Sequence, residues 1–207
     1  FLLEFLRETS LLRHRVRLSP QGNSPLFRGK SIDPRLWVEA GYVVQAAASA
    51  IGWNSDVEAD ECEIWLTHPD WAQADGDSKH PPFYVELDER EEPGPDAEWS
   101  WLASFTGAWP TRATMGLFIA DDRLNHGPWK KRLRNNDAIV DALVAKGFRY
   151  DSAGARIYIP FLIDVEELAK AFENDSFEIA LQPLAAAVAL LENAYTELDN
   201  LFRLSID

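Results

Sequence analysis

Apolar and polar residues alternate with a period of two in several parts of the chain, the pattern of strands with one buried face. Such alternation covers residues 12–18, 61–66 and 83–88. Residues 148–151 and 155–163 are typical of a hairpin around Ser152-Ala153-Gly154. Residues 114–120 are apolar on both faces, which predicts a central strand.

Other segments repeat their apolar positions at helical spacing. Asp33-Pro34 is a favourable helix start, and Gly52 stands where a C-terminal glycine belongs. Between them the apolar positions are Leu36, Ala40, Val43, Ala47 and Ile51. Further helices are predicted over residues 1–9, over 137–146, after a capping box of Asp164 and Glu167, and from Pro183 onward.

The C-terminal segment keeps an apolar seam in alternating steps of four and three residues. Such a heptad seam either packs on the chain's own sheet or joins a partner helix. We expect it to pack on the sheet, as part of the core. Its positions are Phe177, Leu181, Leu184, Val188, Leu191, Tyr195, Leu198 and Phe202.

This order of elements predicts an α+β fold, with a mostly antiparallel sheet, helices packed on at least one face and a long C-terminal helix. We expect one domain over residues 1–207, because this length can bury a core of its own. If a boundary divides it, the acidic, proline-containing segment 89–98 is the place. The helix 34–51 and the strand 114–120, with Val43 and Phe118, should form the core.

The chain is acidic, with a formal net charge of -14. Acidic residues dominate 36–122 and 158–207, whereas 1–35 and 123–157 are basic overall. Nucleic-acid binding is therefore expected only through these basic islands, since phosphate neutralisation supplies most of that affinity. No apolar run reaches membrane-spanning length, so no membrane partner is expected.

The inventory of reactive residues is small. The single Cys62 excludes an internal disulfide and a cysteine-rich zinc site, and it favours a reducing, cytoplasmic compartment. The four histidines lack metal-ligand spacing, and no nucleophile elbow, phosphate loop or dinucleotide fingerprint is present. We expect no cofactor and no catalytic residue.

Acidic side chains nevertheless share strand faces in the middle of the chain. Glu61 and Glu63 lie on one face of their strand, and Glu86 and Asp88 on one face of theirs. If these strands are neighbours, Glu86 and Asp88, with Asp121 at a strand end, could hold Mg²⁺ or Mn²⁺ for phosphoryl chemistry. Alternatively the carboxylates pair across the sheet with Arg13, Arg15 and Arg17.

A second candidate site follows the central strand. Its residues combine acids, an imidazole, an indole and cations, so a phosphate-bearing ligand could be held by the cations with a base stacked on the indole. The alternative is a surface loop whose tryptophan covers the core. The candidate binding residues are Asp121, Asp122, His126, Trp129, Lys130, Lys131 and Arg132.

A short string of residues suggests nuclease chemistry. Pro69-Asp70, followed by Asp77-Ser78-Lys79, resembles the signature of the PD-(D/E)XK nuclease superfamily, which holds a metal with its acidic residues. In that family the second part lies on a strand after a longer spacer. Here the spacer is short and the second part lies in a loop, so we interpret the similarity as coincidence.

The leading hypothesis is a non-enzymatic acidic protein that acts through protein–protein contacts. An inhibitor, an immunity protein or an accessory subunit would each fit, with a partner that presents a basic surface and with carboxylates that imitate phosphates. The alternative is a metal-dependent nuclease or phosphohydrolase that uses the carboxylate cluster.

Overall fold

A computed structural model describes residues 32–58, 63–72, 82–90, 101–107 and 114–204. Six strands form one sheet in the order β1-β2-β3-β4-β6-β5, and every neighbouring pair is antiparallel. The α+β fold and the antiparallel sheet are as predicted. The strands are β1 (Asn54–Glu58), β2 (Glu63–Thr67), β3 (Phe83–Arg90), β4 (Thr114–Asp121), β5 (Arg149–Asp151) and β6 (Arg156–Pro160).

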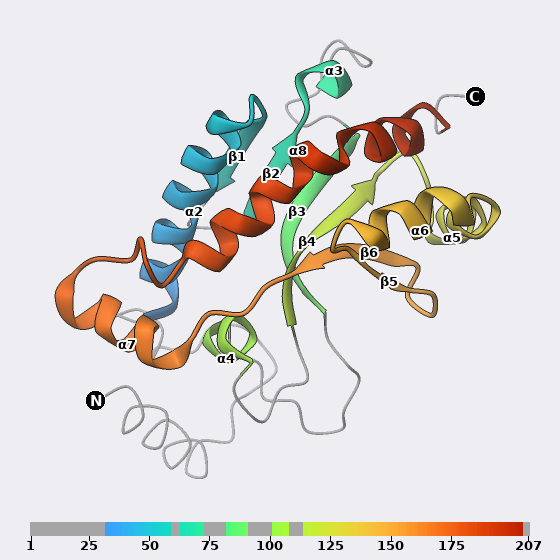
Figure 1. Ribbon diagram of the computed structural model, residues 1–207. Coiled ribbons are helices and arrows are strands. Elements are labelled where there is room, and N and C mark those ends of the chain that lie inside the picture. Colours follow the sequence, from blue (N-terminus) through green and yellow to red (C-terminus); the bar gives the residue numbers. More distant parts are fainter. Residues whose placement is uncertain (1–31, 59–62, 73–81, 91–100, 108–113, 205–207) are drawn as a thin grey trace, which may run out of the picture.

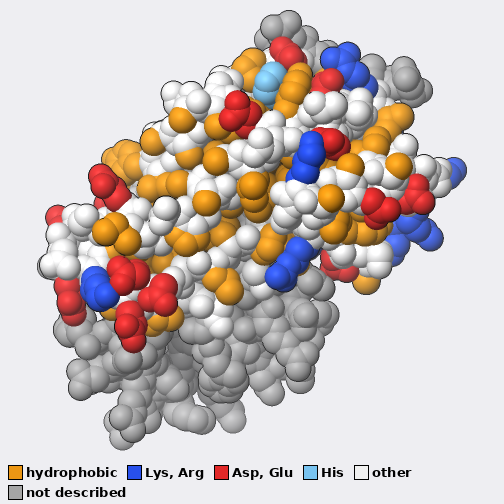
Figure 2. Space-filling view, in the orientation of Figure 1, with side chains coloured by type: hydrophobic (Ala, Val, Ile, Leu, Met, Phe, Trp, Pro, Cys, Tyr) orange, Lys and Arg blue, Asp and Glu red, His pale blue; other side chains and the backbone are white. Residues whose placement is uncertain are grey.

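The described helices contribute to a single apolar core on one face of the sheet (Figure 1). In Figure 1 the long red helix α8 crosses in front of the central strands, beside the blue α2. Figure 2 shows the same side of the molecule, where apolar side chains lie among scattered charged ones. The helices are α2 (Ile32–Ala50), α3 (Pro69–Ala72), α4 (Trp101–Thr106), α5 (His126–Asn135), α6 (Asp137–Ala145), α7 (Val165–Asn174) and α8 (Gln182–Arg203).

Strand alternation places the core on one side of the sheet. Ile64 and Leu66 of β2 belong to the core, as do Val85 of β3, Leu117 of β4 and equivalent positions of β6. Successive side chains of a strand point to opposite faces, so the residues between them lie on the other face. Phe118 is only 3% exposed, yet it lies on that other face and outside the main core. The prediction that α2 and β4 form the core is confirmed, and Phe118 is buried as expected, although on the opposite face of the sheet.

Helix α2 buries a stripe that differs from the predicted one. Leu36 and Ala40 are buried as expected, but Trp37, Val44 and Ala48 complete the stripe, while Val43 and Ala47 are only partly buried. The buried side of the helix is centred nearer to the large Trp37, which is fully buried. Bare backbone at Gly41 also lets α2 approach β1 closely, because a Cβ there would lie 2.6 Å from Val57 Cγ1.

The apolar seam of the C-terminal segment belongs to the core, as predicted. All of its positions are buried except Tyr195, which is half-buried, and α8 packs against α2 and α6. Pro183 stands in the first turn of α8, where its missing N–H costs nothing. Leu191 and Leu198 have no exposed surface. The part of the seam before Gln182 consists of turns rather than helix.

Local capping signals predicted several boundaries. Asp164 caps α7, and its Oδ1 accepts hydrogen bonds from the backbone N–H groups of Glu166 and Glu167. Gly147 follows α6 with a φ of 101°, a conformation that favours glycine. The predicted hairpin is observed as β5 and β6. Along the described residues, no helix is both long and apolar enough to span a membrane.

Two segments that we expected to be loops contain helices. Residues 69–72 form α3, and its Trp71 is fully buried against Phe83 and Phe202. Residues 126–135 form α5, which buries Trp129 and Leu133. The predicted elements at 1–9 and 12–18, most of the expected boundary at 89–98, and Cys62 lie outside the described residues.

Candidate functional site

The sheet face opposite the core carries the acidic residues of the middle of the chain. Register pairs Trp65 of β2 with Glu86 of β3, Glu86 with Phe118 of β4, and Phe118 with Tyr158 of β6. A row of aromatic and acidic side chains therefore crosses four strands. Continuing the β2–β3 register by two residues brings Glu63 opposite Asp88. The condition for the carboxylate cluster, that these two strands are neighbours, is therefore met.

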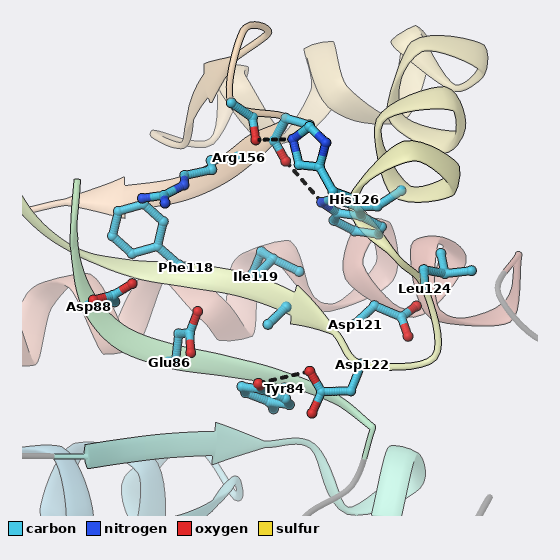
Figure 3. Close-up of a pocket in the computed structure, with 14 residues that line it drawn as sticks. Tyr84, Glu86, Asp88, Phe118, Ile119, Asp121, Asp122, Leu124, His126 and Arg156 are labelled. Carbon is cyan, nitrogen blue, oxygen red and sulfur yellow. Dashed lines mark hydrogen bonds between the residues drawn. The ribbon is translucent and has the colours of Figure 1, made fainter. Parts of the chain in front are cut away.

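A pocket of about 280 Å³ opens on this face, between β3, β4 and the start of α5 (Figure 3). Tyr84, Glu86 and Asp88 come from β3 and Phe118 from β4, while Arg156 approaches from β6. Four of the seven predicted binding residues line it, and so do all three predicted metal ligands. The lining residues that the sequence pattern had singled out are Glu86, Asp88, Asp121, Asp122, His126 and Trp129.

Glu86 is a largely buried carboxylate on the pocket side of the sheet. Burial raises its pKa to about 7, and repulsion from Asp88, Asp122 and Glu63 adds to the effect, while Arg156 opposes it. The carboxylate makes no hydrogen bond or ion pair with any residue that the structure describes. A largely buried carboxylate without an ion-pair partner is stabilised whenever a further cation approaches it.

Tyr84 and Asp122 close one side of the pocket. The Tyr84 hydroxyl donates a hydrogen bond to Asp122 Oδ1 at 3.1 Å, drawn as a dashed line in Figure 3. Burial raises the pKa of Tyr84 above its ordinary value, and the charges of Glu86 and Asp122 raise it further. The phenol therefore stays protonated at neutral pH and acts as a donor that orients Asp122.

Asp121 is among the lining residues, but its side chain lies on the core side of the sheet. It pairs with Phe83 on the core side of the sheet, and its side chain has no exposed surface. Arg123 holds it with two hydrogen bonds, Nε to Oδ1 at 2.8 Å and Nη2 to Oδ2 at 3.0 Å. Arg132 lies 3.7 Å from Oδ2. Asp121 is thus an ion-pair anchor rather than a partner of Glu86 and Asp88.

The predicted metal ligands consequently do not converge. Glu86 and Asp88 lie on the pocket side of the sheet and Asp121 on the core side. Among the residues with described positions, no group of three or more His, Cys, Asp or Glu side chains is arranged to hold a metal ion. The chemistry of this donor set does not favour Mg²⁺ or Mn²⁺, which prefer several carboxylates at one point.

Three side chains of α5 hold the turn of the β5–β6 hairpin. Trp129 donates from Nε1 to the carbonyl oxygen of Ala155 at 2.9 Å, and Lys130 from Nζ to that of Ala153 at 2.9 Å. His126 donates from Nε2 to the carbonyl oxygen of Gly154 at 3.2 Å. Ala155 has a φ of 53°, an unusual conformation for alanine that these contacts help to maintain.

This arrangement leaves no cluster of cations for a phosphate. Trp129 is only 8% exposed, so its ring is not a platform for a base. Lys130 is engaged by the hairpin, Lys131 is exposed, and Arg132 lies beside Asp121. The alternative that Trp129 covers the core describes the observed structure, with the tryptophan on a helix rather than a loop.

Replacing Trp129 by Phe should test the role of this indole. The substitution keeps most of the buried ring but removes the donor to Ala155, so we expect the free energy of unfolding to fall by about 1–2 kcal/mol. Urea denaturation measures the difference. Lys130→Met is the matched control, because its exposed contact should contribute less than about 0.5 kcal/mol. A Trp129→Phe midpoint equal to that of the unmodified protein would show that the hydrogen bond is not stabilising.

The nuclease-like string does not assemble in the described residues. Asp70 lies in α3, where its Oδ2 accepts a hydrogen bond from the Tyr195 hydroxyl at 2.7 Å and its backbone N–H donates to His68 Nδ1. These contacts join α3 to α8, which is a structural role. The second half of the string, at 77–79, lies outside the described residues, as do Arg13, Arg15 and Arg17 with their predicted ion pairs.

Eight of the 14 described residues that line the pocket were not among the predicted site residues, and three of the eight bear on recognition. Tyr84 appeared only as part of a strand, Phe118 as a core residue, and Arg156 only as part of a hairpin. The even positions of β3 did carry a signal, since Tyr84, Glu86 and Asp88 alternate with apolar residues. Nothing in the sequence indicated that β6 would pair with β4 and bring Arg156 to the same face.

Fold and site together define an acidic α+β protein with helices on one face of an antiparallel sheet and a pocket on the other. No family model matches the chain, and neither the curated proteins nor the solved structures give a match. The function is therefore argued from the site alone.

Proposed function

We propose that the protein acts without catalysis, by binding a partner protein through the acidic sheet face defined by Glu63, Glu86, Asp88 and Asp122. The partner presents a basic surface, and the carboxylates occupy it as phosphates of a nucleic acid would. An inhibitor, an immunity protein or an accessory subunit works in this way.

One observation carries the proposal: Glu86 is largely buried, yet no described cation makes an ion pair with it. A folded protein that keeps a carboxylate in a pocket without an ion-pair partner loses stability by doing so. A basic partner removes this cost when it binds, which makes the acid useful for recognition. The flanking Glu63 and Asp122 are exposed and extend the negative surface around the pocket.

Electrostatics at longer range supports the same proposal. The net charge of -14 attracts a basic partner from a distance and speeds its association. This attraction weakens with salt, since the Debye length falls to about 8 Å at physiological ionic strength. The association rate is therefore expected to fall steeply with added salt, and the dissociation rate much less.

The test compares two variants of equal charge and composition. One neutralises the acidic sheet face with Glu63→Gln, Glu86→Gln and Asp88→Asn. The control neutralises three exposed acids of the helical layer with Glu173→Gln, Glu192→Gln and Asp141→Asn. The probe is an arginine-rich synthetic peptide, and the same peptide with citrulline at each arginine reports non-electrostatic binding.

Calorimetric titration should give a dissociation constant that is at least about tenfold larger for the sheet-face variant than for the control. The citrulline peptide should not bind either of them. Equal losses in the two variants would mean that net charge, not this face, attracts the peptide. No binding of the arginine-rich peptide to the unmodified protein at low salt would refute the proposal.

The alternative function, a metal-dependent nuclease or phosphohydrolase, is tested by calorimetric titration with the metal, by thermal melting and by a cleavage assay. It requires heat on addition of Mg²⁺ or Mn²⁺, a higher melting temperature with the metal, and cleavage of a nucleic acid. All three should disappear in Glu86→Gln with Asp88→Asn. We expect none of them, because Asp121 is turned to the other face of the sheet.

A further inference from the structure

The wall of the pocket shows which chemical group it accepts. The Arg156 guanidinium carbon lies 5.7 Å from the centroid of the Phe118 ring, as Figure 3 illustrates. The Phe118 ring also stacks on the ring of Tyr158 from β6, with centroids 4.7 Å apart. A planar cation over an aromatic face is a favourable contact, and arginine makes it more often than lysine does.

Arg156 is held at the rim rather than in the pocket. It is exposed, and its Nη1 donates a long hydrogen bond of 3.4 Å to the carbonyl oxygen of Glu89. It makes no ion pair with Glu86, although its charge acts on that carboxylate. Of the 14 described residues that line the pocket, Arg156 is the only arginine or lysine.

The floor and sides of the pocket complement a second cation. Glu86 lies between the Tyr84–Asp122 pair on one side and Asp88 on the other. The volume of about 280 Å³ suffices for a single long side chain with its charged end. A guanidinium suits this setting, since its fork of donors matches a carboxylate while its flat faces pack on rings.

We propose that this pocket is the subsite for one arginine side chain of the basic partner, and that Arg156 is an internal counter-ion which the incoming arginine displaces. This inference rests on the proposed function and makes it specific. Glu86 receives the guanidinium, Phe118 and Tyr84 pack against it, and Arg156 swings from the Phe118 ring toward solvent. Arg156 therefore lowers the affinity for the partner and guards the pocket when the partner is absent.

The experiment uses acetyl-arginine amide as the probe and acetyl-citrulline amide as its neutral isostere. NMR titration of the full chain should shift the resonances of Phe118 and Tyr84 with the arginine compound and not with the citrulline compound. Glu86→Gln should abolish these shifts. Arg156→Gln should bind the arginine compound about two- to fivefold more tightly, because an exposed competing charge is removed.

The Arg156 variant decides between an internal competitor and a structural residue. Weaker or unchanged binding in Arg156→Gln would overturn the counter-ion assignment, and equal shifts with the citrulline compound would overturn the arginine subsite. Binding of the arginine-rich peptide without any effect of acetyl-arginine amide would leave the proposed function standing and refute only this inference. Binding of acetyl-arginine amide without binding of the peptide would refute the proposed function, and the pocket would then be an arginine site that no basic protein partner uses.

Discussion

Leu191→Glu combined with Leu198→Glu is expected to unfold the protein. Both leucines are fully buried in α8, which packs against α2 and α6 over the sheet. Each substitution places an unpaired carboxylate in an apolar core, at a cost of several kcal/mol. Two such costs approach the whole stability of a domain, about 5–15 kcal/mol. Far-ultraviolet circular dichroism and denaturant titration measure the loss.

The same helix offers a matched control. Asn193→Glu with Asn200→Glu adds two carboxylates at the same seven-residue spacing, on exposed positions of α8. This variant should remain folded, with a midpoint close to that of the unmodified protein. A folded leucine variant with an unchanged spectrum and half the original mass in light scattering would contradict us. It would mean that the seam joins copies of the chain.

Glu86→Gln is expected to stabilise the protein at alkaline pH. The pKa of Glu86 is raised from an ordinary value of 4.5 to about 7, so the folded state binds this proton more tightly than the unfolded state does. Below about pH 4.5 the carboxyl is neutral in both states and costs nothing. Stability is then lost as the pH rises toward 7, and the full penalty remains above it.

Glutamine keeps the shape of the side chain and removes this penalty. We expect a gain of roughly 1–3 kcal/mol at pH 8 and almost none at pH 4, measured by urea denaturation at both values. Glu173→Gln on the exposed side of α7 should change stability by less than about 0.5 kcal/mol at either pH. A pH-independent effect of Glu86→Gln would show that the carboxylate is solvated or paired in solution.

Patterns that act locally predicted most of the fold. The seam of α8, the cap at Asp164 and the hairpin each depend on residues close in sequence, and each is observed. The alternation in β3 correctly separated Val85 and Leu87 from Glu86 and Asp88. These features need no knowledge of distant parts of the chain, because side-chain direction follows from the local backbone.

Features that depend on distant contacts were missed. In β4 both Phe118 and Ile119 are apolar, so alternation could not tell which face was core, nor that Asp121 would turn to it. The buried stripe of α2 includes Trp37, whose ring packs edge-to-face on Phe105 of the distant α4. Helix α5 is rich in charge and lacks a side-chain cap, so its sequence resembles a loop. Its indole and imidazole find their acceptors only in the folded hairpin.

The contact between α2 and α8 also bears on the synthesis of the protein. These helices are neighbours in space, yet more than a hundred residues of sheet and helix are translated between them. Until residues 182–203 leave the ribosome, the apolar side of the sheet lacks its longest cover. The growing chain therefore presents an exposed hydrophobic surface until α8 is available to close it, and such a surface promotes aggregation.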